Sequence, residues 1–381
     1  MKVDRPFIEA MRHATQLIRT QGPRAATQFI QGLFRTGPPM PPATAARSGE
    51  RAGDSVTLIE DIVDPIAKVE PRATEAPFEL PRSSGEFLSK HFSSGAGARD
   101  YKLYVPSSYL GSPAPLLVML HGCTQDPDDF ALGTRANRWA ERRRCLVVYP
   151  QQTKRANGHR CWNWFRPEDQ NAGRGEPAII AGIARQVIDE YQIDTQRVYV
   201  AGLSAGGAMA AIVGQAYPEL FAAIGVHSGL PVGAAHNVPS ALAAMKSGRP
   251  HSALRSQRNR SAVPLIVLHG DSDRTVNPAN ASRSIELALA TQRSGTPLRT
   301  VELSADATEG NHAYRRTQHV EENGKSLVEE WAIQGAGHAW SGGDAAGSYA
   351  DARGPDATKV MLEFFDQHTV AETTAAPQTT N

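Results

Sequence analysis

Short runs of apolar residues alternate with amphipathic stretches along the middle of the chain. Five of these runs have the length and β-branched content of buried strands: PLLVMLH, CLVVYP, VYVAGLS, FAAIGVHS and PLIVLHG. Helical periodicity occurs near residues 129–142, 177–191, 205–217 and 278–292. Strands that are apolar throughout and alternate with helices predict a parallel sheet covered by helices on both faces.

Antiparallel pairs are predicted on either side of this pattern. EFLSKHF and DYKLYVP, joined by SSGAGAR, form the first pair, and AYRRTQHV and SLVEEWAI flank the Asn-Gly turn of EENGK. DATKVMLEFFDQH predicts a closing amphipathic helix. An antiparallel hairpin followed by a mostly parallel sheet is typical of the α/β-hydrolase fold, and we expect residues 81–369 to form such a domain.

Three further segments differ in composition from this domain. Residues 1–35 carry two short amphipathic patterns broken at Gly22-Pro23, and they predict a helical hairpin. Residues 36–80 are rich in proline, alanine, glycine and charge, and predict a flexible linker. Residues 370–381 predict a disordered tail. The N-terminal segment MKVDRPFIEAMRHATQLIRT has no continuous apolar run and carries charge throughout, so a secretory signal is not predicted.

Charge and cysteine content exclude some classes of function. The chain has 40 Lys and Arg against 39 Asp and Glu, so no general attraction to nucleic acid or to an anionic membrane is expected. No apolar stretch has the length that spans a bilayer. Three cysteines without a Cys-x-x-Cys pair do not indicate a disulfide framework. The sequence does not indicate an oligomeric state.

One predicted strand runs directly into a helix through a turn of small residues, VYVAGLSAGGAMAAI. In Gly202-Leu203-Ser204-Ala205-Gly206 the glycines two positions before and after the serine let the two backbones approach. Ser204 is then expected at positive φ with its hydroxyl exposed, as in the nucleophile elbow of α/β-hydrolases. The alternative is a serine that only caps the following helix.

A serine nucleophile needs a general base and an acid that orients the base, and on this fold the acid precedes the histidine in the chain. The loop after PLIVLHG offers Asp271 and Asp273. We assign the acid to Asp273, because HG-x-x-D-x-x-V is the usual form of this loop, with Val276 packing it. Asp271 is the alternative, and as a turn residue it would be structural.

Four later histidines are candidates for the base. His338 lies in QGAGHAWSGG directly after a predicted strand, where glycines let its ring approach Ser204. We therefore assign the base to His338 rather than to His312. His319 and His368 are expected at ordinary surface positions.

An oxyanion hole needs two backbone N–H groups near the serine hydroxyl. Ala205, the first residue of the helix after Ser204, is expected to supply one of them. The loop in PLLVMLHGCTQDPDDF is expected to supply the other from Cys123, since Gly122 allows a close approach.

With these positions the chain resembles the polyhydroxybutyrate depolymerase family of esterases, which also contains feruloyl and acetylxylan esterase-like members. The resemblance covers about residues 85–368 and rests on LHGCTQ, VVYPQQ, CWNWF, RGEPAII, VYVAGLSAGGAMA, HGDSDRTVNP and GAGHAWSGG. It implies a triad of Ser204, Asp273 and His338 with Cys123 and Ala205 as oxyanion donors. It implies no metal and no organic cofactor.

The resemblance also bears on localisation and on the cysteines. It favours an extracellular protein, whereas the lack of a visible signal segment favours a cytoplasmic one. Cys123 and Cys161 both fall in predicted loops, and a bridge between them would hold the Cys123 N–H in position. A reducing compartment would favour two thiols instead. Cys145 is expected to be a buried thiol.

Trp340, Trp162 and Gln125 are the candidates for substrate contact. Trp340 follows His338 by two residues, and an indole there would form an apolar wall for an acyl chain. For Trp162, and for Trp164 beside it, burial against the sheet is an equal alternative.

The sequence thus predicts a serine ester hydrolase acting on a polyester or acyl-ester substrate. A short-chain polyhydroxyalkanoate, poly-3-hydroxybutyrate or its oligomers, is the first hypothesis, and a feruloyl or acetyl ester on polysaccharide is the second. A hydrolase fold without activity, used as an interaction protein, is the alternative from another class.

Overall fold

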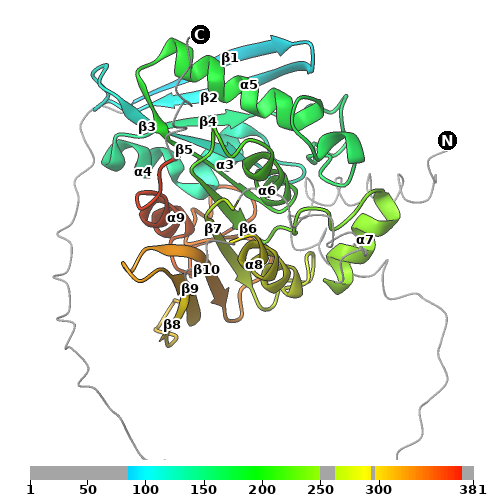
Figure 1. The fold of residues 1–381 in the computed structure, drawn as a ribbon, viewed down its shortest axis with the longest axis vertical. Helices are drawn as coiled ribbons and strands as arrows, with labels where there is room; N and C mark the ends of the chain where they lie inside the picture. The colour runs from blue at the N-terminus through cyan, green and yellow to red at the C-terminus, as the bar shows by residue number, and fades with distance from the viewer. Residues whose placement is uncertain (1–84, 249–261, 293–296, 371–381) are drawn as a thin grey trace, which may run out of the picture. The chain divides into compact units, whose positions relative to one another are not determined.

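The computed structural model describes residues 85–248, 262–292 and 297–370. Its centre is a ten-stranded sheet in the order β1-β2-β4-β3-β5-β6-β7-β10-β9-β8 (Figure 1). The strands are β1 (Glu86–Ser94), β2 (Gly97–Val105), β3 (Ala114–Leu120), β4 (Leu146–Pro150), β5 (Ile193–Leu203), β6 (Ala223–His227), β7 (Leu265–Gly270), β8 (Arg299–Ala305), β9 (Tyr314–Val320) and β10 (Ser326–Ile333). The predicted hairpin at 1–35, the linker at 36–80 and residues 371–381 lie outside the described residues.

The middle of the sheet is parallel, as the apolar strand patterns predict. β4, β3, β5, β6, β7 and β10 run in one direction, and the side chains of β4, β6 and β7 are buried along their whole length. β1 and β2 form the predicted antiparallel hairpin at one edge. The α/β-hydrolase fold predicted from the sequence is confirmed.

The other edge of the sheet extends further than predicted. The Asn-Gly turn joins β9 to β10 as expected, with Gly324 at a φ of 84°. β8 then pairs with β9 and adds an outermost antiparallel strand. Sequence reasoning missed β8 because five of its seven residues are exposed and its apolar positions do not alternate regularly with polar ones.

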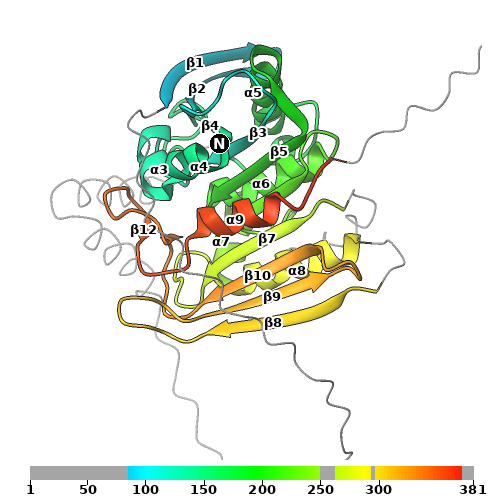
Figure 2. The same ribbon diagram turned by 90° about the vertical axis from the view of Figure 1, so that its left-hand side faces the viewer.

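Helices cover both faces of the sheet, and each face has its own hydrophobic core (Figures 1 and 2). On one face α5 (Gly175–Glu190), α6 (Ala205–Ala216) and α8 (Ala279–Thr291) pack through residues such as Ile180, Met209 and Ile285. On the other face α3 (Pro127–Thr134), α4 (Ala136–Arg143) and α9 (Ala357–Phe365) pack through Phe130, Trp139 and Met361.

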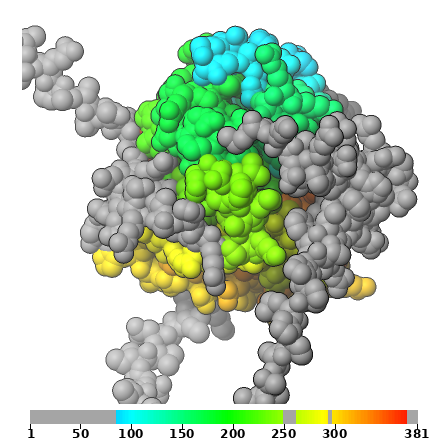
Figure 3. Space-filling model, turned by 90° about the vertical axis from the view of Figure 1, so that its right-hand side faces the viewer, coloured from blue at the N-terminus to red at the C-terminus, as the bar shows by residue number. Residues whose placement is uncertain are grey.

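Two helical features differ from the sequence prediction. The helix predicted near 129–142 is divided into α3 and α4 at Arg135, whose φ is 55°. The additional helix α7 (Val238–Ser247) begins at a capping box between Asn237 and Ser240. Figure 3 shows the face on which α7 lies, and Val238 is 50% exposed there. None of the described helices is both long enough and apolar enough to serve as a membrane span.

The carboxyl ends of the parallel strands carry the candidate residues. Cys123 follows β3, Ser204 follows β5, Asp273 follows β7 and His338 follows β10. β3, β5, β6, β7 and β10 are consecutive neighbours in the sheet. Their following loops therefore meet at one edge, where open α/β sheets form their ligand sites.

Candidate active site

Ser204 occupies a strained turn between β5 and α6. Its φ is 57° and its ψ is −118°, a combination that residues other than glycine rarely adopt. The Ser204 N–H donates to the His227 carbonyl at 2.9 Å, and the Ser204 carbonyl accepts from the Ala208 N–H at 2.9 Å. The hydroxyl makes no capping hydrogen bond to the helix. The serine is therefore held by its backbone, and its side chain does not have the alternative role of a cap.

The glycines around Ser204 are required by contact between backbones. A Cβ atom on Gly206 would lie 2.0 Å from the Leu120 carbonyl oxygen and 2.5 Å from that of His121. A Cβ atom on Gly202 would lie 2.5 Å from the Gly206 carbonyl. The elbow is thus pressed against the end of β3, and the loop that carries Cys123 begins at that contact.

Asp273 is buried in the loop after β7. Its Oδ1 accepts hydrogen bonds from the backbone N–H groups of Thr275 and Val276, and its Oδ2 faces the rings of His338 and His269. Burial by itself would raise the pKa of this carboxyl, but the hydrogen bonds from His269 and His338 outweigh it and hold the pKa well below its usual range. Asp273 is therefore an ionised acceptor. Val276 is fully buried, as predicted for this loop.

His338 directs its Nδ1 at Asp273 Oδ2, with 2.7 Å between the two atoms. A Cβ on Gly270 would lie 2.2 Å from the Ala336 carbonyl, so the loop that carries His338 packs directly on the end of β7. The alternative acid, Asp271, points elsewhere: its Oδ1 accepts from the Gly335 N–H at 2.7 Å. Asp271 thus fastens the same loop without contacting the ring.

The other three histidines have different partners. His312 Nε2 lies 3.0 Å from Asp351 Oδ2, and Arg353 holds that same carboxylate. His319 lies on β9 with its Nδ1 3.3 Å from Thr300 Oγ1. His368 is 1% exposed and packs on Phe364, so the expectation of a surface position was wrong for His368. The closing helix α9 buries its end against the sheet, which the amphipathic pattern alone did not reveal.

The two expected oxyanion donors have no acceptor in the structure. The Gly122 N–H donates to Gln125 Oε1 and the Thr124 N–H donates to the His159 carbonyl. Between them, the Cys123 N–H makes no hydrogen bond to any described residue, and the same holds for the Ala205 N–H at the start of α6. Two backbone N–H groups without an acceptor, those of Cys123 and Ala205, are what an oxyanion hole requires.

A disulfide joins Cys123 to Cys161, with 4.2 Å between the two Cα atoms. It links the loop that carries Cys123 to the segment that carries Trp162 and Trp164. Cys145 is a buried free thiol whose pKa is raised to about 12 by burial. Burial keeps this thiol protonated and unreactive.

The predicted substrate-binding tryptophans lie behind the site and do not reach its surface. Trp340 is 1% exposed, stacks on the His227 ring and donates from Nε1 to Thr358 Oγ1. Trp162 is fully buried and donates from Nε1 to the His121 carbonyl at 3.1 Å. For Trp340 the expected wall for the substrate is corrected to internal support, because the indole fills the core and satisfies its N–H there. For Trp162 the structure favours the alternative of burial over substrate contact.

Gln125 is also buried, at 2% exposure, and its amide is fully used. Its Oε1 accepts from the Gly122 N–H at 2.9 Å, while Nε2 donates to Asp129 and to the Ser348 carbonyl at 3.0 Å. Gln125 therefore does not face a substrate. It ties the loop that carries Cys123 to α3 and to the segment between β11 (Trp340–Ser341) and β12 (Ala350–Asp351).

Tyr349 is an aromatic side chain beside the site that sequence reasoning missed. It precedes β12, has a φ of 51° and is 40% exposed. Its hydroxyl lies 3.4 Å from the hydroxyl of Thr124, next to Cys123, and its carbonyl accepts from the Trp340 N–H. The sequence gives little sign that Tyr349 lies beside the site, because contacts with α3, such as that of the Ser348 N–H with Asp129, set the position of its loop.

The polar groups at this edge are of the types that acyl transfer uses: a serine hydroxyl, an imidazole held by a carboxylate, and unused backbone N–H groups. Ser204 Oγ and His338 Nε2 make no hydrogen bond to each other or to another described residue. Catalytic hydrogen bonds of this kind commonly tighten only when substrate is bound.

Across the described ranges 85–248, 262–292 and 297–370, no group of three or more His, Cys, Asp or Glu side chains is arranged to hold a metal ion.

Comparison with known proteins identifies the family. The family model described as "Esterase PHB depolymerase" matches residues 99–293. The chain belongs to this esterase family. The resemblance inferred from the seven sequence segments is confirmed.

Members of the family with curated descriptions are similar over most of the described chain. Poly(3-hydroxyalkanoate) depolymerase C of Paucimonas lemoignei is 31% identical over 279 residues, which are 69% of this chain and 64% of that protein. Poly(3-hydroxybutyrate) depolymerase of Ralstonia pickettii is 28% identical over 271 residues, covering 65% of this chain and 54% of that protein. The alignments thus span less than two thirds of either relative.

Among solved structures, the acetyl xylan esterase from Aspergillus awamori has the same fold. Its TM-score is 0.58 with 20% sequence identity, and the match covers 74% of this chain and 100% of that chain. At 20% identity this comparison supports the fold of this chain and says nothing about its activity or substrate.

Proposed function

We propose that this chain is a serine carboxylic-ester hydrolase in which Ser204, Asp273 and His338 form the catalytic triad. The observation that carries the proposal is the 2.7 Å contact from Asp273 to His338 at the sheet edge where Ser204 stands in its strained turn. The unused N–H groups of Cys123 and Ala205 at the same edge add the oxyanion donors.

In the first half of the reaction Ser204 Oγ attacks the ester carbonyl carbon and its proton passes to His338 Nε2. Asp273 holds the ring in the tautomer that has Nε2 free, and it stabilises the imidazolium that forms. The carbonyl oxygen becomes an oxyanion and accepts hydrogen bonds from Cys123 and Ala205, each such donor contributing about 10²–10³ in rate. When the ester C–O bond breaks, the alcohol leaves with the proton from His338.

In the second half water cleaves the acyl-enzyme. His338 accepts a proton from the water as its oxygen attacks the acyl carbonyl on Ser204, and the same two N–H groups bind the second oxyanion. Collapse of that intermediate releases the carboxylic acid and returns the proton to Ser204 Oγ. The cycle requires no external electron donor or acceptor.

For the substrate we propose a short-chain polyhydroxyalkanoate, with poly-3-hydroxybutyrate or its oligomers as the first candidate. The names of the two depolymerase relatives support this class. So does the half-exposed Tyr349 beside the oxyanion loop, because an aromatic ring offers an apolar surface to the methyl groups of such a polyester. A feruloyl or acetyl ester is the competing substrate.

Labelling with a fluorophosphonate probe tests the chemistry. The full chain should react with the probe, Ser204→Ala should lose both labelling and p-nitrophenyl butyrate hydrolysis, and Ser282→Ala, an exposed serine on α8, should keep both. We expect the Ser204→Ala loss to be on the order of 10⁴-fold or more. A chain that is folded and is not labelled would instead support the hydrolase fold without activity.

Assays with poly-3-hydroxybutyrate emulsion, its oligomers, methyl ferulate and acetylated xylan test the substrate. Release of 3-hydroxybutyrate at a higher kcat/KM than release of ferulate or acetate supports the proposal. The opposite ranking would assign the chain to the polysaccharide-ester substrates.

A further inference from the structure

The loop from His121 to Thr124 is held at almost every polar backbone atom. The His121 carbonyl accepts from Trp162 Nε1, and the Cys123 carbonyl accepts from Thr124 Oγ1. The Gly122 carbonyl accepts a 2.8 Å hydrogen bond from His121 Nδ1 and a longer one, 3.4 Å, from the Gln125 N–H. The N–H groups of Gly122 and Thr124 are also used, as described above. The hydrogen bonds of the neighbouring backbone groups thus set the direction of the remaining Cys123 N–H. One of these hydrogen bonds comes from the buried imidazole of His121.

The His121 ring lies behind this loop, and the side chain is 1% exposed. Its Nδ1 lies 2.8 Å from the Gly122 carbonyl oxygen, and its Nε2 lies 3.1 Å from the backbone nitrogen of Gln152. The Gln152 N–H can only donate, so Nε2 must accept and cannot carry a proton. Burial lowers the pKa of His121 to about 4, so the ring is neutral at neutral pH. Its single proton is therefore on Nδ1 and points at the Gly122 carbonyl.

The Gly122 carbonyl and the Cys123 N–H belong to one peptide unit. In a trans peptide the C=O and N–H bonds are coplanar and point in opposite directions. A hydrogen bond that fixes the carbonyl toward His121 consequently fixes the N–H away from His121. No described residue accepts from that N–H.

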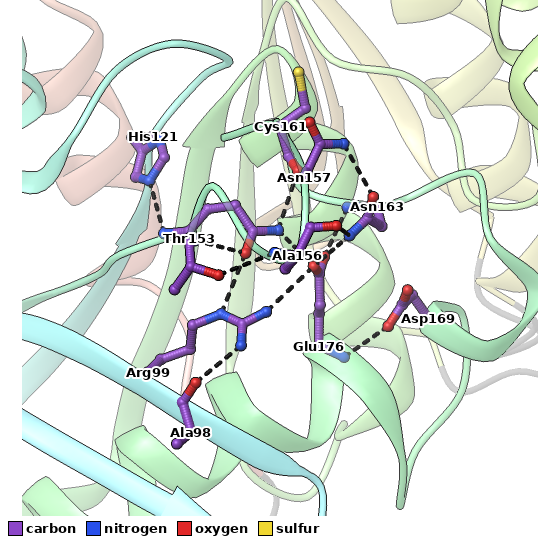
Figure 4. Close-up of polar contacts among 11 residues, drawn as sticks. Ala98, Arg99, His121, Thr153, Ala156, Asn157, Cys161, Asn163, Asp169 and Glu176 are labelled. Carbon is purple, nitrogen blue, oxygen red and sulfur yellow. Dashed lines mark hydrogen bonds and ion pairs between the residues drawn. The ribbon is translucent and has the colours of Figure 1, made fainter. Parts of the chain in front are cut away.

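A buried polar network of Arg99, Asn163 and Glu176 (Figure 4) holds Gln152 in turn. Gln152 is fully buried, and its Nε2 donates to Glu176 Oε1 and to the Cys161 carbonyl. Glu176, 4% exposed on α5, also accepts from Asn163 and lies 3.6 Å from an Arg99 nitrogen. Arg99 Nε donates to Gln152 Oε1. Every polar atom of the Gln152 amide is used, so its backbone N–H is a fixed donor for the ring.

We propose that His121 is the positioning residue of the oxyanion hole: its Nδ1–H holds the Gly122 carbonyl so that the Cys123 N–H is directed at the reacting ester. This inference rests on the proposed function. His121 acts through the peptide unit and touches no reacting atom, and the network of Gln152, Glu176 and Arg99 fixes its tautomer. Loss of the Nδ1 donor should therefore reduce the stabilisation of the transition state and leave substrate binding nearly unchanged.

Two substitutions separate the two ring nitrogens. In His121→Asn the side-chain amide nitrogen takes the place of Nδ1 and can still donate to the Gly122 carbonyl. In His121→Gln the amide lies at the place of Nε2, so the contact with Gln152 is kept. The shorter of the two hydrogen bonds to the Gly122 carbonyl is lost, and the 3.4 Å one from the Gln125 N–H remains. Each variant loses one of the two hydrogen bonds that the ring makes. The two variants are thus matched in the number of ring hydrogen bonds lost, and they differ in whether the side chain still donates to the Gly122 carbonyl.

The readouts are kcat and KM for p-nitrophenyl butyrate, and the affinity for a trifluoromethyl ketone, which forms an oxyanion on Ser204. His121→Gln should lower kcat by about 10²-fold with little change in KM, and should lower the affinity for the ketone by a similar factor. His121→Asn should stay within about tenfold of the wild type. Equal losses in both variants, or losses that follow their melting temperatures, would overturn the proposal.

The tautomer can be measured in the wild-type protein without any substitution. Long-range ¹H–¹⁵N correlation of the histidine rings should show His121 with its proton on Nδ1. A proton on Nε2, or a charged ring at neutral pH, would sink the proposal even if the variants failed to fold. Fluorophosphonate labelling of the same sample reports the proposed function separately, so failure of one idea is not read as failure of the other.

Discussion

Asp273 and His338, 65 residues apart in the chain, meet through a 2.7 Å contact between Oδ2 and Nδ1. β7 and β10 are parallel neighbours in the sheet, so the loops that follow them leave the same edge. The carboxylate of Asp273 is stabilised by the neighbouring histidines and two backbone N–H groups, and it stays ionised although it is buried. An ionised carboxylate on Nδ1 leaves Nε2 free to accept a proton.

Asp273→Asn should reduce kcat for p-nitrophenyl butyrate by about 10³–10⁴-fold, because an amide in this place does not hold the required tautomer. Asp271→Asn is the matched control, since an amide oxygen can still accept from the Gly335 N–H. We expect less than about tenfold loss for that variant. The reverse order of the two variants would move the acid to Asp271.

Gly206→Ala should disable the elbow, because its Cβ would lie within 2.0 Å of a backbone oxygen of β3 that cannot move aside. We expect a loss of several kcal/mol in the free energy of unfolding, or an insoluble protein. Gly158→Ala is the control, because a Cβ at Gly158 meets nothing within 4 Å. Urea unfolding and esterase activity of the two variants check the contact, and equal stability of both would contradict it.

Tyr349→Ala should raise KM for hydroxybutyrate oligomers several-fold while kcat for p-nitrophenyl acetate changes little, since the ring contributes surface area and not chemistry. Tyr349→Phe should behave as the wild type. Leu110→Ala, at an 88% exposed position between β2 and β3, controls for the loss of any apolar surface residue. A loss of kcat on the small ester would show that Tyr349 acts within the catalytic machinery.

The disulfide should affect the rate more than binding. Thiol titration of the denatured, unreduced protein should find one free thiol, that of Cys145. Cys161→Ser frees the oxyanion loop, so we expect kcat to fall by roughly tenfold with a smaller change in KM. Cys145→Ser, which leaves the bridge in place, is the comparison. Three free thiols in the titration would exclude the bridge in the protein as prepared.

His368 should make the protein less stable in acid. Burial lowers its pKa to about 3, whereas in the unfolded chain it is near 6.5. The unfolded state therefore binds a proton first. The contribution of neutral His368 is fully present above about pH 6.5, and it is lost progressively as the pH falls toward about 3, by up to about 1.4 kcal/mol per pH unit.

His368→Phe keeps a ring against Phe364 and removes the titrating group. Urea unfolding from pH 8 to pH 4.5 should then show a shallower decline of stability in the variant than in the wild type. Above pH 7 the two curves should run parallel. An unchanged slope below pH 6 would mean that His368 is not buried in solution.

The sequence by itself predicted the sheet, the order of its parallel strands along the chain, and the loops that carry Ser204, Asp273 and His338. These features follow from local physical rules. A continuous apolar run must be covered on both faces, and a serine between two glycines marks a close approach of strand and helix. The choice of Asp273 over Asp271 depended on the loop pattern HG-x-x-D-x-x-V, because both residues are acidic and lie in one turn.

Only the tertiary structure decided which side chains face solvent at the site. Trp340, Trp162 and Gln125 have the residue types of a binding site, but each is buried by elements distant in sequence, such as α9 for Trp340 and the loop before β12 for Gln125. Tyr349 reaches Thr124 across 225 positions of the chain. The local sequence pattern shows whether a position is apolar. Its exposure depends on which residue from a distant part of the chain packs against it. Those contacts form only when the loops meet at the edge of the sheet.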